Sequence, residues 1–400
     1  MFTFVNYSLF TFVIQNLGMT FGALISSWFD SYKASELSHR YITNSHIEPL
    51  LNSLPDFCSV KMIGRSVNAL PIYHVNLGSG STRVLMWSQM HGNESTTTKA
   101  VFDLINLLDT EVFSYLLDHI TISIVPILNP DGALAYTRMN ANDTDLNRDA
   151  QILSQPESLV LKGLAEKFDP HFAFNLHGQR TIFSAGDTNN PATLSFLAPA
   201  ADESLSITES RKQAMHVIAK MNEELQRLIP NQVGIYDDAF NLNCVGDTFQ
   251  AKGIPTILFE AGHYPSDYGR EETRRYMVIA LLTALTEIAK PTNHKTSIED
   301  YQAIPENQKR FYDIILRNAN NGSNNLVDIA LQYQEVLEQD HIEFIPKVEK
   351  IESHLDFYAH KEIDLQGGKV VTTEGEEIEI GYDKDFVVKS ELLSQKLTDC

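Results

Sequence analysis

Four polar residues of this chain, each placed just after a short apolar run, carry the side chains needed to bind a metal ion and activate water. They are His91, Glu94, His177 and Glu260. Short apolar runs that alternate with helical patterns are typical of buried parallel strands, and in open α/β sheets the site forms at the carboxyl ends of such strands. Two histidines and one carboxylate make a catalytic zinc set with one position open for water. A further carboxylate can be the base for that water, so the pattern predicts a zinc hydrolase with Glu260 as base.

The prediction of a zinc hydrolase rests on the four residues taken together. A lone His-x-x-Glu pair is a weak signal, and each residue by itself is typical of a satisfied polar side chain near a loop. Here the pair His91 and Glu94 lies between an expected strand and an expected helix, while two more strands end at His177 and Glu260. The H-E-x-x-H spacing of helix-borne zinc proteases is absent.

The elements expected around these residues alternate between strands and helices. Expected strands are 60–63, 72–77, 83–90, 120–128, 172–176 and 255–259. Expected helices cover about 29–54, 95–108, 156–168, 208–228 and 271–289. Two segments with glycine, 78–81 and 129–132, are expected to be turns. This order predicts an α/β fold with a mixed, largely parallel central sheet flanked by helices.

The composition changes after Pro291, where residues 291–294 are typical of a domain boundary. Beyond it the sequence predicts a helix at about 305–320, a linker at 318–325 and short strands at 370–373, 378–380 and 386–388. We therefore expect an N-terminal segment 1–40, a catalytic domain 41–290 and a small α+β or β-rich extension 291–400 of unknown function.

The overall composition favours a soluble globular protein. The 400 residues are 43% hydrophobic and 21% charged, which is ordinary for that class. The formal net charge of −21 argues against a nucleic-acid partner, because phosphate binding needs a basic surface. Three scattered cysteines without a C-x-x-C pair predict neither a cysteine zinc site nor a disulfide framework, and they fit a reducing compartment.

The N-terminal stretch Met1–Trp28 is apolar but fits neither a secretory signal nor a membrane span. No charge precedes Asp30, whereas a signal needs a positive n-region, and polar residues interrupt the run too often for a span. Met19 is an alternative start. We expect a cytoplasmic protein, with a secreted or periplasmic location as the alternative, and the sequence predicts no oligomeric state.

The segment 129–149 supplies cations close to the expected metal site. It contains Arg138 and the adjacent pair Asn147 and Arg148. An arginine side chain can hold a carboxylate with two hydrogen bonds or stabilise an oxyanion. The alternative is a loop stabilised by Asp143 and Asp145, and spacing alone does not decide between the two.

With these motifs the chain resembles the zinc carboxypeptidases of the carboxypeptidase A family, the M14 metallopeptidases, over roughly residues 45–290. The resemblance rests on His-Gly-Asn-Glu at 91–94, Asn-Pro-Asp-Gly at 129–132, Asp-Leu-Asn-Arg at 145–148, Asn-Leu-His at 175–177 and Phe-Glu at 259–260. It implies a zinc carboxypeptidase-like fold, one Zn²⁺ per chain, and a peptide substrate with a free C-terminal carboxylate.

By this resemblance Arg138 polarises the scissile carbonyl, and Asn147 and Arg148 hold the terminal carboxylate of the substrate. The chain departs from the family at Asn93, where many members have arginine. The mobile tyrosine of the family is Tyr236 by spacing, with Tyr264 as a second candidate. The pair Gln179 and Arg180, directly after the third ligand motif, is a further candidate for substrate contact.

Two other functions are consistent with the same motifs. The succinylglutamate desuccinylase and aspartoacylase group also uses H-G-N-E and D-L-N-R elements with a small β-rich C-terminal domain, and it cleaves small N-acyl amino acids. The spacing from NPDG to Arg138 favours the peptidase over this deacylase. A catalytically dead binding module would have lost a ligand or the base, and none is lost here.

Asp247 lies in the segment 236–250, which is expected to line the pocket for the substrate side chain. It could select a basic substrate residue or cap a turn.

Overall fold

The computed structural model describes residues 20–290, 298–320, 325–389 and 394–396. The chain divides into two compact units, which are described separately below. Unit 1 comprises Met1–Gln179 and Ala192–Asn307, and unit 2 comprises Arg180–Pro191 and Gln308–Cys400. The expected boundary at 291–294 lies outside the described residues. Within the described part, no helix combines the length and the apolar character that crossing a bilayer requires.

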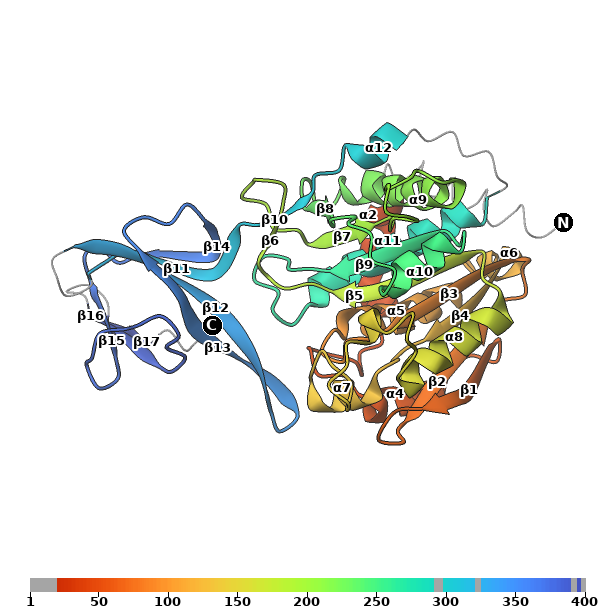
Figure 1. The fold of residues 1–400 in the computed structure, drawn as a ribbon, viewed down its shortest axis with the longest axis horizontal. Coiled ribbons are helices and arrows are strands. Elements are labelled where there is room, and N and C mark those ends of the chain that lie inside the picture. Colours follow the sequence, from red (N-terminus) through yellow and green to blue (C-terminus); the bar gives the residue numbers. More distant parts are fainter. Residues whose placement is uncertain (1–19, 291–297, 321–324, 390–393, 397–400) are drawn as a thin grey trace. The chain divides into compact units, whose positions relative to one another are not determined.

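Unit 1 is built on a mixed sheet of eight strands, in the order β1-β2-β4-β3-β5-β9-β7-β8 (Figure 1). The strands are β1 (Cys58–Arg65), β2 (Pro71–Leu77), β3 (Thr82–Ser88), β4 (Ile120–Val125), β5 (Phe172–Gly178), β7 (Leu194–Leu197), β8 (Val233–Ile235) and β9 (Thr256–Ala261). The neighbours β4, β3, β5 and β9 are parallel, whereas β1, β2 and β7 add antiparallel pairings. This confirms the expected mixed α/β fold.

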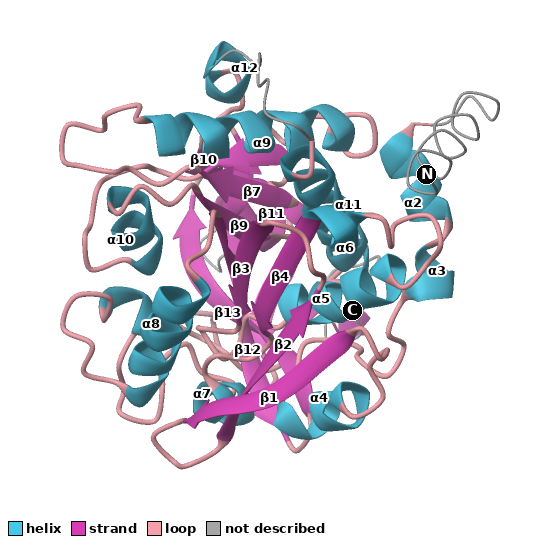
Figure 2. Ribbon diagram, turned by 90° about the vertical axis from the view of Figure 1, so that its right-hand side faces the viewer, coloured by secondary structure: helices cyan, strands magenta, loops and turns pink. Residues whose placement is uncertain are grey.

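Helices cover both faces of this sheet (Figure 2). They are α2 (Phe21–Ser27), α3 (Phe29–Tyr32), α4 (Asn44–Leu51), α5 (Thr96–Leu108), α6 (Leu116–His119), α7 (Pro130–Ala135), the 3₁₀ turn η1 (Leu146–Arg148), α8 (Pro156–Phe168), α9 (Glu209–Leu225), α10 (Val245–Ala251), α11 (Glu271–Ile288) and α12 (Ile298–Gln302). One face packs α5, α9 and α11 into the larger apolar core. The other face packs α8 and α10 into a smaller core.

The expected helix at 29–54 is wrong, because the structure has α3 and α4 there with a non-helical segment between them. The backbone of that segment is bound by side chains from other helices. Asp103 accepts from the Ala34 amide at 2.7 Å, and Arg274 donates to the carbonyls of Ala34 and Leu37. The expected turn at 129–132 is instead the start of α7, where the Asn129 side chain caps the helix and proline occupies its first position.

Asp103 and Arg274 also form a fully buried ion pair between α5 and α11. Arg274 Nε lies 2.5 Å from Asp103 Oδ2, and both side chains have no exposed surface. Lys99 on α5 pairs with Glu271 on α11 at 2.6 Å. Burial alone would raise the pKa of Glu271, but Lys99 and its other cationic neighbours lower it to about 2. These charges join the N-terminal segment to the two long helices that cover the larger core.

Unit 2 is a β structure. Its strands are β6 (Phe183–Ala185), β10 (Asn307–Lys309), β11 (Phe311–Asn320), β12 (Leu326–Glu338), β13 (His341–Glu352), β14 (Tyr358–Asp364), β15 (Lys369–Thr372), β16 (Phe386–Lys389) and β17 (Ser394–Lys396). β6 pairs with β10, and the remaining strands form one seven-stranded sheet. The expected helix at 305–320 is therefore wrong, because β11 is the strand between β12 and β14. The expected strand at 378–380 is also absent among the described strands, whereas β15 and β16 lie where strands were expected.

Candidate metal centre

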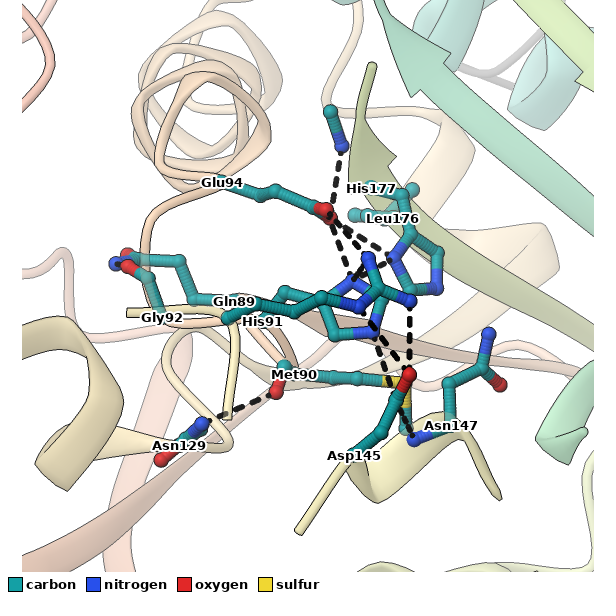
Figure 3. Close-up of polar contacts among 12 residues, drawn as sticks. Gln89, Met90, His91, Gly92, Glu94, Asn129, Asp145, Asn147, Leu176 and His177 are labelled. Atoms are coloured by element: carbon teal, nitrogen blue, oxygen red, sulfur yellow. Dashed lines mark hydrogen bonds and ion pairs between the residues drawn. The ribbon is translucent and has the colours of Figure 1, made fainter. Parts of the chain in front are cut away.

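The turn that carries His91 is held in a strained conformation at the end of β3. Gln89 has a φ of 44°, in the left-handed region that residues other than glycine rarely adopt. Its side-chain amide donates to two backbone carbonyls, one of them that of Gly92 at 2.8 Å. Asn129 Nδ2 donates to the carbonyl of Met90 at 3.3 Å (Figure 3). Such strain persists only where the surroundings enforce it, so the packing of the turn fixes the position of His91.

Gly92 is required by space at this turn. A Cβ atom at Gly92 would lie 1.9 Å from the carbonyl carbon of Gly132, far inside van der Waals contact. The turn after β3 therefore packs directly on the backbone of α7. This explains physically why glycine stands between the two candidate ligands His91 and Glu94.

Three side chains with metal-ligand atoms converge at the carboxyl ends of β3 and β5. His91 Nδ1 lies 2.9 Å from Glu94 Oε1 and 3.1 Å from His177 Nδ1. His177 Nδ1 lies 2.9 Å from Glu94 Oε2 (Figure 3). Among the described residues, this is the one group of three or more His, Cys, Asp or Glu side chains whose ligand atoms all lie within 4.8 Å of one another.

This donor set fits a zinc ion. At zinc–ligand distances of about 2.0–2.1 Å, tetrahedral ligands lie roughly 3.3 Å apart, close to the edges of the triangle above. Two imidazole nitrogens that face each other across a carboxylate need a shared proton or a cation between them. Burial alone would raise the pKa of Glu94, but His91 and His177 lower it well below its usual value. The carboxylate is therefore kept in the charged form that a metal requires.

Asp145, the first residue of the Asp-Leu-Asn-Arg motif, lies behind this triangle. Its Oδ1 accepts from His91 Nε2 at 3.0 Å and from the Asn147 amide at 2.9 Å, while its Oδ2 accepts from Arg138 at 2.9 and 3.2 Å. Burial alone would raise the pKa of Asp145, but the hydrogen bond from His91 and the charge of Arg138 lower it well below the usual range. One carboxylate thus orients a candidate ligand, a cation and the η1 turn together.

Arg138 lies beside the candidate ligands. Its Nη1 is 3.2 Å from His91 Nδ1 and 3.5 Å from Glu94 Oε1. The side chain is 42% exposed, so it can also reach a bound molecule. The structure brings Arg138 to the metal centre, as the sequence predicted, and its role there stays a prediction.

Glu260 lies next to the triangle on the neighbouring strand. In the parallel pairing of β5 with β9, Glu260 is directly opposite His177. It is buried, and its Oε2 has no hydrogen-bond partner among the described atoms. Burial and the nearby Glu94 carboxylate raise the pKa of Glu260 well above its ordinary value. A carboxylate in this environment binds a proton more strongly than one in water, which suits a base.

Asn147 and Arg148 lie on η1, adjacent to Asp145. Arg148 is exposed and forms no ion pair with any carboxylate in the part of the chain that the structure describes. Its Nη1 donates to the Asn147 carbonyl at 2.7 Å and to Cys244 Sγ at 3.1 Å. Nε and Nη2 of Arg148 have no partner among the described residues, so these two donors can receive an anion.

The two tyrosine candidates have different surroundings. Burial raises the pKa of Tyr236, and the charges of Glu260 and Glu94 raise it further. Tyr264 instead packs at the edge of the larger core, with its ring 5.5 Å from that of Tyr276. The assignment of the mobile tyrosine to Tyr236 stays a prediction.

The pair after His177 is split between the two units. The Gln179 side chain is buried and donates to the Ala192 carbonyl at 2.7 Å, so it supports the sheet. Arg180 belongs to unit 2, and its contact with a substrate stays a prediction. Asp247 accepts from the Asn241 amide at 3.1 Å, in agreement with the expectation of a turn cap.

Sequence reasoning missed two residues that shape this centre. Gln89 looked like the end of a strand, and only its positive φ reveals the strained turn. From the sequence, Asp145 is a loop stabiliser and the first residue of the Asp-Leu-Asn-Arg motif, but its bond to His91 is not predicted. Its position three residues before Arg148 in a motif of the family was the one signal that could have found it.

Comparison with known proteins shows which family part of the chain resembles. The family model described as zinc carboxypeptidase matches residues 43–192. Over these residues the chain is similar to the zinc carboxypeptidases. The match includes His91, Glu94 and His177, and it ends before Glu260.

The proteins that this chain is similar to match it over part of their length. A "Probable carboxypeptidase 2" of Arthroderma benhamiae is 31% identical over 118 residues, which are 29% of this chain and 22% of the relative. The matched segment therefore spans about a fifth of that protein. The crystal structure of a metallo-carboxypeptidase from Burkholderia cenocepacia has a TM-score of 0.51 at 20% identity, covering 62% of this chain and 69% of that one. Carboxypeptidase A from Helicoverpa armigera has a TM-score of 0.51 at 15% identity, covering 66% and 79%. These two likenesses establish the shared fold.

Proposed function

We propose that this chain is a zinc-dependent metallocarboxypeptidase that hydrolyses the C-terminal peptide bond of peptides. The observation that carries the proposal is the triangle of His91, Glu94 and His177 beside the buried carboxylate of Glu260. The family match over residues 43–192 supports it. The exposed and unpaired Arg148 supports an exopeptidase, because a free C-terminus brings a carboxylate.

In this proposal His91, Glu94 and His177 hold one Zn²⁺, which supplies an acidified water and a Lewis acid for the scissile carbonyl. Glu260 takes a proton from the attacking water on its carboxylate and later gives that proton to the leaving amine. Its burial strengthens the base, as the raised pKa indicates. Arg138 donates hydrogen bonds to the developing oxyanion, a contribution typically worth about 10²–10³ in rate.

Asn147 and Arg148 determine which peptide bond of the substrate is cleaved. Arg148 binds the terminal carboxylate of the substrate through Nε and Nη2, and Asn147 donates from its side-chain amide. Because both residues are fixed on η1 next to Asp145, they hold the terminal carboxylate of the substrate at a short, fixed distance from the metal. A peptide without a free terminal carboxylate loses this contact.

The test compares two N-acetylated pentapeptides that differ only in a C-terminal carboxylate or carboxamide. Products are identified by mass spectrometry for the zinc-loaded protein, with and without a chelator. We expect chelator-sensitive release of the last residue from the acid alone. Arg148→Met should raise KM for the acid at least about tenfold, whereas the matched surface variant Arg227→Met should not change it. Cleavage of neither peptide by zinc-loaded protein would overturn the proposal and direct attention to N-acyl amino acids.

The cytoplasmic location stays a prediction that cell fractionation can test.

A further inference from the structure

The proposed carboxylate clamp, defined as Asn147 and Arg148, is bonded to the start of α10. Asn147 Oδ1 accepts from the Val245 amide at 3.0 Å. Arg148 Nη1 donates to Cys244 Sγ at 3.1 Å. Both members of the clamp are therefore anchored to two consecutive residues, although these lie almost a hundred positions further along the chain.

Further bonds join the same two segments. The Ala150 amide donates to the Asn243 carbonyl at 3.3 Å, and Gln151 Nε2 donates to the Leu242 carbonyl at 3.1 Å and to Thr248 Oγ1 at 2.7 Å. The segment 241–244 is itself held, because the Cys244 amide donates to the Asn241 carbonyl at 2.8 Å. The clamp thus lies on a rigid support.

The chemistry of the Cys244 side chain matters for the charge of the clamp. A thiol is a weak hydrogen-bond acceptor, and burial raises the pKa of Cys244, so the sulfur stays uncharged near neutral pH. It orients the guanidinium without neutralising it. A carboxylate at the same place would form an ion pair with Arg148 and compete with the carboxylate of a substrate.

We infer that Cys244 is a positioning residue for Arg148, holding the guanidinium in the orientation that receives a substrate carboxylate while leaving its positive charge unpaired. This inference rests on the proposed function, and it adds α10 to the machinery that recognises the C-terminus. It assigns no chemistry to the sulfur.

Three substitutions test this role. Cys244→Asp adds a competing charge, Cys244→Asn has nearly the same shape without the charge, and Cys244→Ser keeps a small acceptor. For the free-acid pentapeptide, we expect Cys244→Asp to raise KM at least about tenfold with kcat within about threefold, the scale of one hydrogen bond to a charged group. Cys244→Asn and Cys244→Ser should raise KM less than about threefold. Cys58→Ser, on β1, is the matched thiol control and should leave both constants unchanged.

Melting temperatures of all variants establish that they are folded, and a binding measurement separates failure of this inference from failure of the proposed function. Calorimetry with N-acetylphenylalanine and its amide reports recognition of a carboxylate without catalysis. Suppose that no peptide is cleaved, but that the wild type binds the acid and Cys244→Asp binds it tenfold more weakly than Cys244→Asn. The inference about Cys244 then holds although the proposed function fails. Equal KM or affinity for the Asp and Asn variants would overturn it, and so would a wild type that binds neither compound.

Discussion

Asp145→Asn should weaken the metal centre although Asp145 is not a candidate ligand. The substitution keeps the shape of the side chain and one oxygen, which can still accept from His91 Nε2 and from the Asn147 amide. The second oxygen becomes an NH₂ group that faces the Nε and Nη2 donors of Arg138. In the wild type these donors bind Asp145 Oδ2 at 3.2 and 2.9 Å. Two favourable bonds are thus replaced by a donor–donor contact, and the negative charge behind His91 is lost.

The expected loss can be estimated from the bonds that change. A carboxylate that accepts from a metal-bound imidazole raises the basicity of the ligand, and removing such a partner typically costs 10–100-fold in metal affinity. That range corresponds to about 1.4–2.7 kcal/mol. Displacement of Arg138 adds a loss of oxyanion stabilisation, so kcat/KM should fall by more than the metal affinity alone predicts.

Competition with a chromogenic chelator measures the zinc affinity, and hydrolysis of the free-acid pentapeptide at saturating zinc measures the rate. Asp143→Asn is the matched control, because Asp143 is exposed on the same loop and asparagine tolerates its positive φ of 55°. If Asp145→Asn bound zinc within about twofold of the wild type, the proposed link from Asp145 through His91 to the metal would be refuted.

Glu260→Gln should leave zinc affinity within about threefold while lowering kcat by about 10²–10⁴, the usual contribution of a general base; near wild-type turnover would rule out Glu260 as the base. Asp103→Asn removes the fully buried carboxylate partner of Arg274, which keeps the partly exposed Glu271 at 3.2 Å. It should lower the free energy of unfolding in urea by about 3–5 kcal/mol, and a change below about 1 kcal/mol would contradict this. The hydrogen bond from His216 lowers the pKa of Glu287 from 4.5 to about 2. Since the folded-state pKa is the lower one, Glu287 stabilises the fold above pH 4.5 and loses this contribution as the pH falls towards 2. Glu287→Gln should therefore show a smaller fall in Tm across that window than the wild type, and an equal fall would refute the assignment.

The parts of the centre that follow strand ends could be predicted because the signals are local. Apolar runs before His91, His177 and Glu260 indicate parallel strands, and the carboxyl ends of such strands meet at one edge. The structure places His177 and Glu260 in direct register. The roles of these residues in catalysis stay predictions until the experiments above are done.

The rest depended on contacts between distant segments. The bond from His91 to Asp145 spans 54 positions, and the periodicity of neither segment indicates it. Residues 305–320 have apolar side chains on both faces, which fits a helix or a central strand, and only pairing with β12 and β14 decides for the strand. The segment 33–43 is not helical because Arg274, more than two hundred residues away, binds its carbonyls.

The division of the chain has a consequence for its synthesis. Residues 180–191 belong to unit 2 and contain β6. This strand pairs with β10, which begins only at Asn307. The stretch Ala192–Asn307 is translated in between, and at about 5–20 residues per second this takes on the order of ten seconds. During that interval the nascent β6 has an unpaired backbone edge, which is the kind of segment that chaperones shield and that misassociates when crowded. The order of translation therefore delays closure of unit 2 until most of unit 1 has already emerged from the ribosome.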